Sequence, residues 1–432
     1  MKKILSLVLV LCMALTAVSA LAEARPYEGQ KLTLLFMSGT YADTARAIEA
    51  DFEAATGAEI EIVDFPYATL HEKMLLDFTS GTCSYDVVDV ACQWDGEMAP
   101  FLEPLDPYIE RDGFDIEDFD QNILDNCGRW EGTIYGIPNA NTPFCLAYRT
   151  DIVPADEVPQ TWDEYVETAL KYQDVENGLY GIASAASKGQ YGGLYYSRIW
   201  SQGVDWCDAD WNSMMLSDEV RWATEHVGKA MAAIDPAGLN WGVAEATAAF
   251  QNGNAVFLET WPTLGICLTG NSDESPIKGK WALMPMPTGY DTDINVLSGW
   301  DISINAASQN KELAWEFIKA YTSPETMLLA FNNFSILPPR LSVWEHPDVK
   351  NSDMYSSKDY LKGSVIWWRI PASEQARTEI NNYLHMYMSG DMDVDEALQL
   401  MHEGVQMALE DNPPPEGMQN STYLTVQNIL GK

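Results

Sequence analysis

Residues 31–65 decide the fold class, and they read KLTLLFMSGTYADTARAIEADFEAATGAEIEIVDF. The run 31–36 is short and apolar, which is typical of a buried strand. Residues 41–56 then repeat apolar side chains at the helical period, and Gly57 follows as a helix stop signal. The alternation of apolar and polar residues over 59–65 predicts a second strand. Strand, helix and strand in this order predict a βαβ unit.

The same alternation continues along the chain. Residues 67–80 repeat the helical period up to Gly81, and residues 85–91 form the next apolar run. Strands alternating with helices imply right-handed crossovers and mostly parallel sheets, so the fold class is α/β. A capping box, TWDE at 161–164, opens another helix. We expect further strands at 144–148, 255–258 and 302–304, further helices at 242–252, 311–321, 373–388 and 393–409, and a polar, aromatic loop region from residue 181 that includes 190–200.

Length and charge narrow the class of protein. The chain has 432 residues, so it should divide into about two domains. It carries 64 acidic against 25 basic residues, a formal net charge of -39, while 47% of its residues are hydrophobic. A chain with this much apolar material is globular. So large a negative charge repels phosphate backbones, so nucleic acid is excluded as a partner.

The N-terminus predicts export. Residues 1–24 read MKKILSLVLVLCMALTAVSALAEA, with two lysines, an apolar run and small-residue cleavage sites. This is the pattern of a secretory signal peptide, and a membrane anchor is the alternative. Leu11 stands directly before Cys12, where a lipoprotein peptidase requires a small residue. We therefore expect a freely secreted or periplasmic protein without a lipid anchor.

The other cysteines leave two possibilities open. Six remain beyond Cys12, at 83, 92, 127, 145, 207 and 267, with no C-x-x-C pair. An oxidising compartment allows disulfides, and the pairs Cys83/Cys92 and Cys127/Cys145 are near in sequence. Buried free thiols are the equal alternative.

No catalytic or cofactor motif stands out. The five histidines are not spaced as H-x-x-x-H, and the chain has no G-x-S-x-G elbow, no phosphate-binding G-x-x-x-x-G-K-[ST] loop and no G-x-G-x-x-G fingerprint. We therefore expect no metal site and no cofactor. Paired carboxylates for glycoside hydrolysis stay possible, because a chain with 64 acidic residues offers many pairs.

Tryptophans beside polar residues predict a sugar site. A pyranose ring stacks on an indole through its apolar face, and its hydroxyls need donors and acceptors. Trp94 and Asp95 follow one predicted strand and Trp261 follows another, at the strand ends where α/β proteins bind ligands. The other candidates are Trp300 beside Asp301, Asn139 and Asn141 in a turn, and the run Trp367-Trp368-Arg369. For any single tryptophan, a place in the core is the alternative.

A resemblance to a known family spans nearly the whole mature chain. Residues 304–321, INAASQNKELAWEFIKAY, are similar to the signature helix, and the strand before it, of the family-1 extracellular solute-binding proteins of ABC importers. This group includes the maltodextrin-binding proteins. Supporting stretches follow in the family's order: SYDVV at 84–88, PLD at 104–106, GTIYGIP at 132–138, TWDE at 161–164, AFQNG at 249–253, MPMP at 284–287, LPPR at 337–340 and DEAL at 395–398.

The resemblance implies a two-lobed, type II periplasmic-binding-protein fold whose lobes close over a ligand. Lobe 1 is expected at 25–140 plus 297–345 and lobe 2 at 141–296 plus 346–432, with residues 1–24 as signal peptide. The chain would cross between the lobes near 139–143, 295–300 and 340–350. Carried onto this chain, the expected ligand-binding residues are Trp94, Asp95, Asn139, Asn141, Tyr191, Trp261, Trp300 and Arg340. Tyr41, Asp301 and Trp368 are further candidates, and the run 367–371 has no fixed counterpart in the family.

The function that the resemblance implies is ligand capture without catalysis. The protein would bind a carbohydrate, with an oligosaccharide favoured by the rich aromatic content, and deliver it to ABC permease subunits as a monomer. A secreted carbohydrate-active hydrolase and a sugar sensor that presents its ligand to a chemoreceptor are the alternatives.

Overall fold

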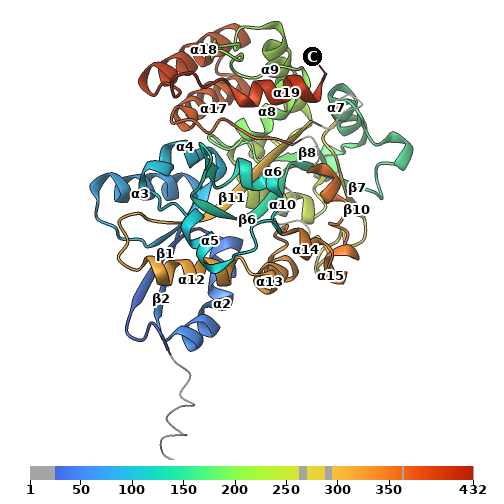
Figure 1. Cartoon of the computed structure of the whole chain (residues 1–432). Helices are drawn as coiled ribbons and strands as arrows, with labels where there is room; N and C mark the ends of the chain where they lie inside the picture. The colour runs from blue at the N-terminus through green and yellow to red at the C-terminus, as the bar shows by residue number, and fades with distance from the viewer. Residues whose placement is uncertain (1–24, 262–269, 288–293, 362–363, 432) are drawn as a thin grey trace, which may run out of the picture. The chain divides into compact units, whose positions relative to one another are not determined.

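The computed structural model describes residues 25–261, 270–287, 294–361 and 364–431 (Figure 1). The predicted signal peptide, Cys12 and Cys267 lie outside these residues. The chain divides into two compact units: a first unit up to Val88 together with Ile304–Tyr321, and a second unit of Asp89–Ser303 with Thr322–Lys432. No helix among the described residues is long and apolar enough to cross a membrane. The lobes predicted from the sequence are parts that would move when a ligand binds. Their boundaries stay a prediction.

The first unit is the predicted βαβαβ segment. Strand β1 (Lys31–Met37) pairs in parallel with β2 (Glu59–Phe65) and with β3 (Val87–Ala91). The connections are α2 (Thr40–Thr56) and α3 (Tyr67–Ser80). Helix α2 ends at Gly57, which takes the left-handed conformation (φ 78°) that a side chain disfavours. These elements lie within one or two residues of the sequence prediction.

Helix α12 (Lys311–Tyr321) completes the first unit from a distant part of the chain. Phe52 of α2 meets Phe317 edge to face, with ring centroids 5.3 Å apart. The hydroxyl of Tyr321 donates to the backbone oxygen of Tyr41 over 3.0 Å, and Tyr41 is fully buried in this unit. The helix predicted at 311–321 is therefore confirmed.

The second unit contains two groups of longer strands. In one, β11 (Asn295–Ile304) pairs antiparallel with β6 (Gly136–Pro143) and in parallel with β12 (Ser364–Val365). The other is a four-stranded sheet in the order β10 (Trp281–Met284), β7 (Cys145–Arg149), β9 (Ala255–Thr260) and β8 (Tyr180–Ser184). Only β8 and β9 run parallel in it, so this sheet is mixed and the prediction of a mostly parallel sheet was wrong here. A short hairpin joins β4 (Arg129–Trp130) and β5 (Thr133–Ile134).

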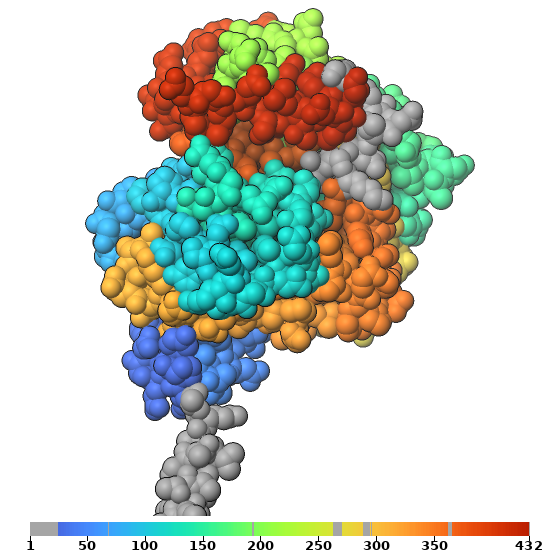
Figure 2. Space-filling model, in the orientation of Figure 1, coloured from blue at the N-terminus to red at the C-terminus, as the bar shows by residue number. Residues whose placement is uncertain are grey.

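Helices surround these strands (Figure 1). The α-helices of the second unit are α4 (Asp95–Met98), α5 (Asp106–Asp112), α6 (Gln121–Asn126), α7 (Trp162–Tyr172), α8 (Gly192–Ser201), α9 (Asp218–Ala230), α10 (Val243–Gln251), α13 (Pro324–Phe334), α14 (Leu341–Trp344), α15 (Pro347–Lys350), α16 (Ser357–Tyr360), α17 (Ser373–Ser389), α18 (Val394–Asp411) and α19 (Ser421–Ile429). The 3-10 helices are η1 (Cys92–Trp94), η2 (Ala99–Phe101), η3 (Ala155–Glu157), η4 (Val175–Asn177), η5 (Met231–Ala233) and η6 (Pro236–Asn240). Figure 2 shows the C-terminal helical residues, coloured red, gathered at one end of this unit.

The predicted capping box is present at the start of α7. The hydroxyl of Thr161 accepts from the backbone N–H of Glu164, and the Glu164 carboxylate accepts from the backbone N–H of Thr161, both over 3.2 Å. Two of the otherwise unbonded N–H groups at the helix start are thereby satisfied.

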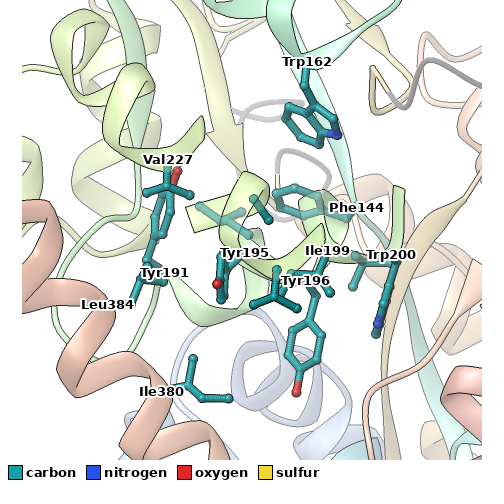
Figure 3. Packing of buried hydrophobic residues seen from close by; sticks show 14 of the residues in the cluster. Phe144, Trp162, Tyr191, Tyr195, Tyr196, Ile199, Trp200, Val227, Ile380 and Leu384 are labelled. Carbon is teal, nitrogen blue, oxygen red and sulfur yellow. The ribbon is translucent and has the colours of Figure 1, made fainter. Parts of the chain in front are cut away.

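The prediction of a loop at 190–200 is wrong, because helix α8 covers most of these residues. Figure 3 shows why: Tyr195, Ile199 and Trp200 pack in the buried apolar cluster, with Ile380 and Leu384 of α17 close by. Two adjacent glycines lower local helix propensity, but burial of large side chains outweighs that cost.

Neither of the two disulfides considered from the sequence, Cys83–Cys92 and Cys127–Cys145, is present among the described residues. Cys83, Cys92, Cys127, Cys145 and Cys207 are all free thiols in the described part of the chain, and all but Cys83 are buried. The free-thiol alternative therefore holds for these five in the structure.

Candidate functional site

The candidate site lies in the second unit, where β6 and β11 run side by side. Trp300 faces Ala140 across the pair, but Asp301 faces Pro138, so Asn139 is an extra residue on β6. Such a bulge bends a strand and re-aims its side chains, and bulges are frequent beside functional sites. This register brings the predicted residues Asn139, Trp300 and Asp301 to one place.

Asp95 is held by an arginine from far along the chain. Nε and Nη2 of Arg369 donate to Oδ2 of Asp95 over 3.1 and 2.6 Å, and the Gly128 N–H donates to the same oxygen over 3.2 Å. Nη1 of Arg369 donates to the backbone oxygen of Asp125 over 2.6 Å. The Asp95 and Arg369 side chains are only 5% and 14% exposed, so each depends on the other for charge compensation. Asp95 was predicted from the sequence, but its partner Arg369 was not.

Asp301 is the acid of the group whose charged form is disfavoured by burial. Burial, and next the charge of Asp95, raise the pKa of Asp301 well above its usual range. Its Oδ1 accepts from the Ser303 hydroxyl over 2.7 Å. Gly136 makes room for this carboxyl, since a Cβ there would lie 1.7 Å from Oδ1 of Asp301. Burial therefore favours the protonated form of the Asp301 carboxyl group, while Asp95 pairs with Arg369.

The other predicted residues of this site are Asn139 and the two tryptophans Trp94 and Trp300. Nδ2 of Asn139 donates to Oδ1 of Asp89 over 2.8 Å. The rings of Trp94 and Trp300 meet edge to face with centroids 5.6 Å apart. Nε1 of Trp94 donates to Glu374 over 3.4 Å. Trp94, which was predicted at the end of a strand, therefore lies next to Trp300, as expected if both belong to one site.

A second aromatic group continues along the same chain segment. Strand β6 leads through Phe144 into β7, and Phe144 meets the ring of Trp261 at 5.5 Å. Trp261 in turn lies 6.4 Å from Trp367, which stacks on Tyr196 at 5.4 Å with an interplanar angle of 13°. Trp261, predicted as a site residue, therefore belongs to an aromatic group with Phe144 and Trp367 that was not predicted from the sequence.

Trp367 and Trp368 lie in different surroundings. Trp368 was the predicted site residue, but its Nε1 donates to Oδ2 of Asp205 over 2.6 Å and its ring packs edge-on against Trp206 and Trp211. Trp367 instead lies beside Trp261. Adjacent tryptophans give no local signal that separates these two environments.

Buried polar atoms without a partner mark the site most directly. Within the described residues, eight such side-chain atoms lie along β6, β9, β11 and the segment after β12: Asn139 Oδ1, Asn141 Oδ1 and Nδ2, Thr142 Oγ1, Thr260 Oγ1, Trp261 Nε1, Asp301 Oδ2 and Trp367 Nε1. A buried polar group without a hydrogen bond destabilises a fold by about 1–3 kcal/mol, so a group of them needs an explanation. Both donors and acceptors are present, which suits a ligand rich in hydroxyl groups. Thr142 and Thr260 were missed, although each adjoins a residue that was named, and Trp367 was named only as part of the run 367–369.

Three predicted residues lie elsewhere. The hydroxyl of Tyr191 donates to Glu259 over 3.3 Å, beside the fully buried Arg198–Glu259 ion pair. Arg340 donates to Thr322 and Asp118 over 2.7 and 3.0 Å and belongs to another cluster of the second unit. Tyr41 belongs to the first unit. Their roles in ligand binding stay predictions.

No group of three or more His, Cys, Asp or Glu side chains in the described ranges is arranged to hold a metal ion.

The α/β fold places aromatic rings and buried polar atoms without hydrogen-bond partners along β6, β9 and β11, an arrangement typical of proteins that bind small molecules. The chain belongs to the bacterial extracellular solute-binding protein family, whose profile matches residues 38–328. It is 28% identical over 344 residues to a probable amino-acid ABC transporter periplasmic-binding protein, y4oP, of Sinorhizobium fredii, with 77% of each chain covered.

Solved structures agree with this assignment. The maltose-bound MalE3 of T. maritima superposes with a TM-score of 0.81 at 25% identity, covering 88% of this chain and all of that one. A solute-binding protein from Agrobacterium radiobacter K84 in complex with ribitol gives 0.80 at 23% identity, covering 89% of this chain and 99% of that one. The predicted family and the two-lobed α/β fold class are confirmed.

Proposed function

We propose that this protein captures a neutral carbohydrate outside the cell membrane and delivers it to the permease of an ABC importer. The observation that carries the proposal is the set of eight buried polar atoms without partners, interleaved with Trp261, Trp300 and Trp367. Sugar hydroxyls both donate and accept, so one ligand could satisfy donors such as Trp261 Nε1 and acceptors such as Asn139 Oδ1. Indole rings offer the flat apolar surface on which a sugar ring stacks.

The charges favour a neutral ligand over an anionic one. Arg369 is paired with Asp95, Arg377 with Glu374, and Arg198 with Glu259. An amino acid, as in the name of the S. fredii relative, brings a carboxylate that needs a cation or several N–H donors. Each of these arginines already has its carboxylate, so a carboxylate-bearing ligand would have to break a buried ion pair.

The same pairing argues against a hydrolase. A glycosidase needs one carboxylate as nucleophile or base and a second carboxylic acid as proton donor. Burial raises the pKa of Asp301 well above its usual range and so favours a proton on this carboxyl group, but Asp95 is tied to Arg369 by two hydrogen bonds. The relatives named above are binding proteins, and we infer binding without catalysis. A sensor that presents its sugar to a chemoreceptor would use the same binding site and would differ only in its partner protein.

We further propose that binding occurs between the lobes 25–140 plus 297–345 and 141–296 plus 346–432, and that residues 1–24 direct export and are removed. A net charge of -39 opposes self-association, which favours a monomer. Sedimentation that does not change with concentration is the expected result.

A thermal-shift screen of the mature protein against neutral sugars, polyols, uronic acids and amino acids tests the proposal. A ligand at 100 times its dissociation constant adds about 2.7 kcal/mol of stability. We expect a neutral sugar to raise the melting temperature, calorimetry to give one site per chain, and chromatography to recover the sugar intact. Stabilisation by amino acids or uronic acids alone, or cleavage of the sugar, would contradict the proposal.

A further inference from the structure

Two cysteines from separate segments meet in the second unit. Cys92 begins η1, and Cys127 directly follows α6. Both side chains are fully buried in a small apolar cluster with Ile123, Leu297 and Ile366. The Cys92 thiol donates to Oε1 of Gln93 over 3.3 Å, and the presence of Cys92 helps to raise the pKa of the Cys127 thiol. Neither thiol has a part in the proposed carbohydrate binding.

Both sulfur atoms lie against Gly299 of β11. Its backbone N–H donates to Sγ of Cys92 over 3.4 Å. A Cβ built on Gly299 would lie 2.1 Å from Sγ of Cys127. The nitrogen and the Cβ of one residue are about 2.5 Å apart. The two sulfur atoms therefore pack against the same backbone unit, and the space that a side chain at Gly299 would fill is taken by Cys127.

We infer that Cys92 and Cys127 are joined by a disulfide bond when the exported chain folds under oxidising conditions. Export follows from the signal sequence over 1–24 and from the extracellular family to which the chain belongs. Disulfides form and persist in such compartments. The inference is independent of which ligand the protein binds.

The chemistry is a thiol–disulfide exchange with a small-molecule disulfide as the oxidant. One cysteine loses its proton, and its thiolate attacks the oxidant to form a mixed disulfide while one thiol of the oxidant leaves. The second cysteine, also deprotonated, displaces the other half of the oxidant. Two S–H bonds and the oxidant's S–S bond break, and one protein S–S bond forms. The two electrons and two protons end on the two thiols released from the oxidant.

Burial determines when this bond can form. Burial, and next the neighbouring Cys92, raise the pKa of the Cys127 thiol well above its usual range, which disfavours the thiolate of Cys127 in the folded protein. Both thiols are also out of reach of an oxidant. The exchange therefore belongs to folding, before the cluster closes, and the bond is afterwards protected from reductants.

The disulfide bond would link the chain segment that carries Asp95 to the segment that donates a hydrogen bond to it. Cys92 stands three residues before Asp95, and Cys127 directly precedes Gly128, whose N–H donates to the Asp95 carboxylate. A covalent link between these two segments would hold the donor and the acceptor of that hydrogen bond together.

The test is disulfide mapping of the mature protein. The protein is unfolded and reduced, then refolded with oxidised and reduced glutathione, quenched in acid, and alkylated in denaturant. We expect the six cysteines beyond Cys12 to lose two titratable thiols, and a non-reduced digest to contain the Cys92 and Cys127 peptides linked, two hydrogens lighter than the free pair. Cys92→Ser and Cys127→Ser should each abolish the linked peptide.

Cys145→Ser and Cys207→Ser serve as matched controls, because they remove other buried thiols and should keep the linked peptide. A wild-type protein that refolds with all six thiols free, or one in which Cys92 or Cys127 is linked to another cysteine, would overturn the inference. The wild-type map decides the question even if a serine variant does not fold.

Discussion

Trp367 and Trp368 are neighbours in sequence whose indole N–H groups meet different surroundings. Trp367 Nε1 is buried without a partner among the described residues, whereas Trp368 Nε1 donates to Asp205 over 2.6 Å. Phenylalanine keeps an aromatic ring but removes the N–H group. Trp367→Phe should weaken carbohydrate binding about three- to tenfold through one lost hydrogen bond, with little change in ligand-free stability.

Trp368→Phe is the matched control for that variant. It should keep the affinity and lower the free energy of unfolding by about 1–3 kcal/mol, because the buried Asp205 loses a donor. Calorimetric titration and ligand-free denaturation of both variants measure the two effects. Equal losses of affinity in the two variants would contradict the assignment of Trp367 to the site.

His226 should make the protein sensitive to acid. Nε of Arg198 donates to Nδ1 of His226 over 3.2 Å, so the proton of the neutral ring is on Nε2, which faces the backbone oxygen of Trp162 at 2.9 Å. Burial, and then the Arg198 charge, lower the pKa of His226 to about 3. The unfolded chain binds this proton below pH 6.5 while the folded chain does not, so stability falls as the pH drops from 6.5 towards 3.

The contribution of His226 to this loss approaches about 1.4 kcal/mol per pH unit well below pH 6.5. His226→Gln, whose amide can both accept from Arg198 and donate to Trp162, should remove that contribution. Urea unfolding of both proteins at pH 7 and pH 5 measures it, and the buried carboxyl groups titrate alike in the two. An unchanged pH dependence in the variant would show that His226 is protonated in the folded state.

At the scale of elements, the pair of strands β6 and β11 depends on the absence of a side chain at Gly136. A Cβ there would lie 1.7 Å from Oδ1 of Asp301 and 2.6 Å from Oγ of Ser303. Gly136→Ala should therefore lower the free energy of unfolding by about 1–3 kcal/mol, the usual cost of overpacking.

Asp301→Ala provides the control for this element, since it removes the nearest obstructing atoms. In that background Gly136→Ala should cost less, and the difference between the two costs is the coupling energy of the pair. Denaturant unfolding of the four proteins measures it. Additive costs would mean that the strand pair shifts to admit the methyl group without pressing on Asp301.

At the scale of the whole molecule, we expect closure on ligand binding. The chain is predicted to cross between the lobes near 139–143, 295–300 and 340–350, and hinged closure around a ligand is a common response of two-lobed binding proteins. Small-angle scattering should give a smaller radius of gyration with a saturating sugar identified by the thermal-shift screen. A sugar that gives no thermal shift is the control, and an unchanged radius at saturation would contradict closure.

The sequence by itself determined the order of the elements and the family. Apolar periodicity, the stop at Gly57 and the capping box at Thr161 depend only on residues within one or two helical turns, so they can be read without knowing the fold. Helix 311–321 and strand 59–65 came out at the predicted residues for this reason. The collinear motifs placed the chain in its family because they keep the same order along it.

Only the tertiary structure decided which side chains meet. Asp95 is paired with Arg369, Cys92 lies against Cys127, and Trp367 rather than Trp368 adjoins Trp261. The helix α8 forms where local propensity predicted a loop. These outcomes depend on burial and on contacts between segments that are distant in the chain. A local pattern holds no information about such contacts, because the free energy that selects them arises only when the segments pack together.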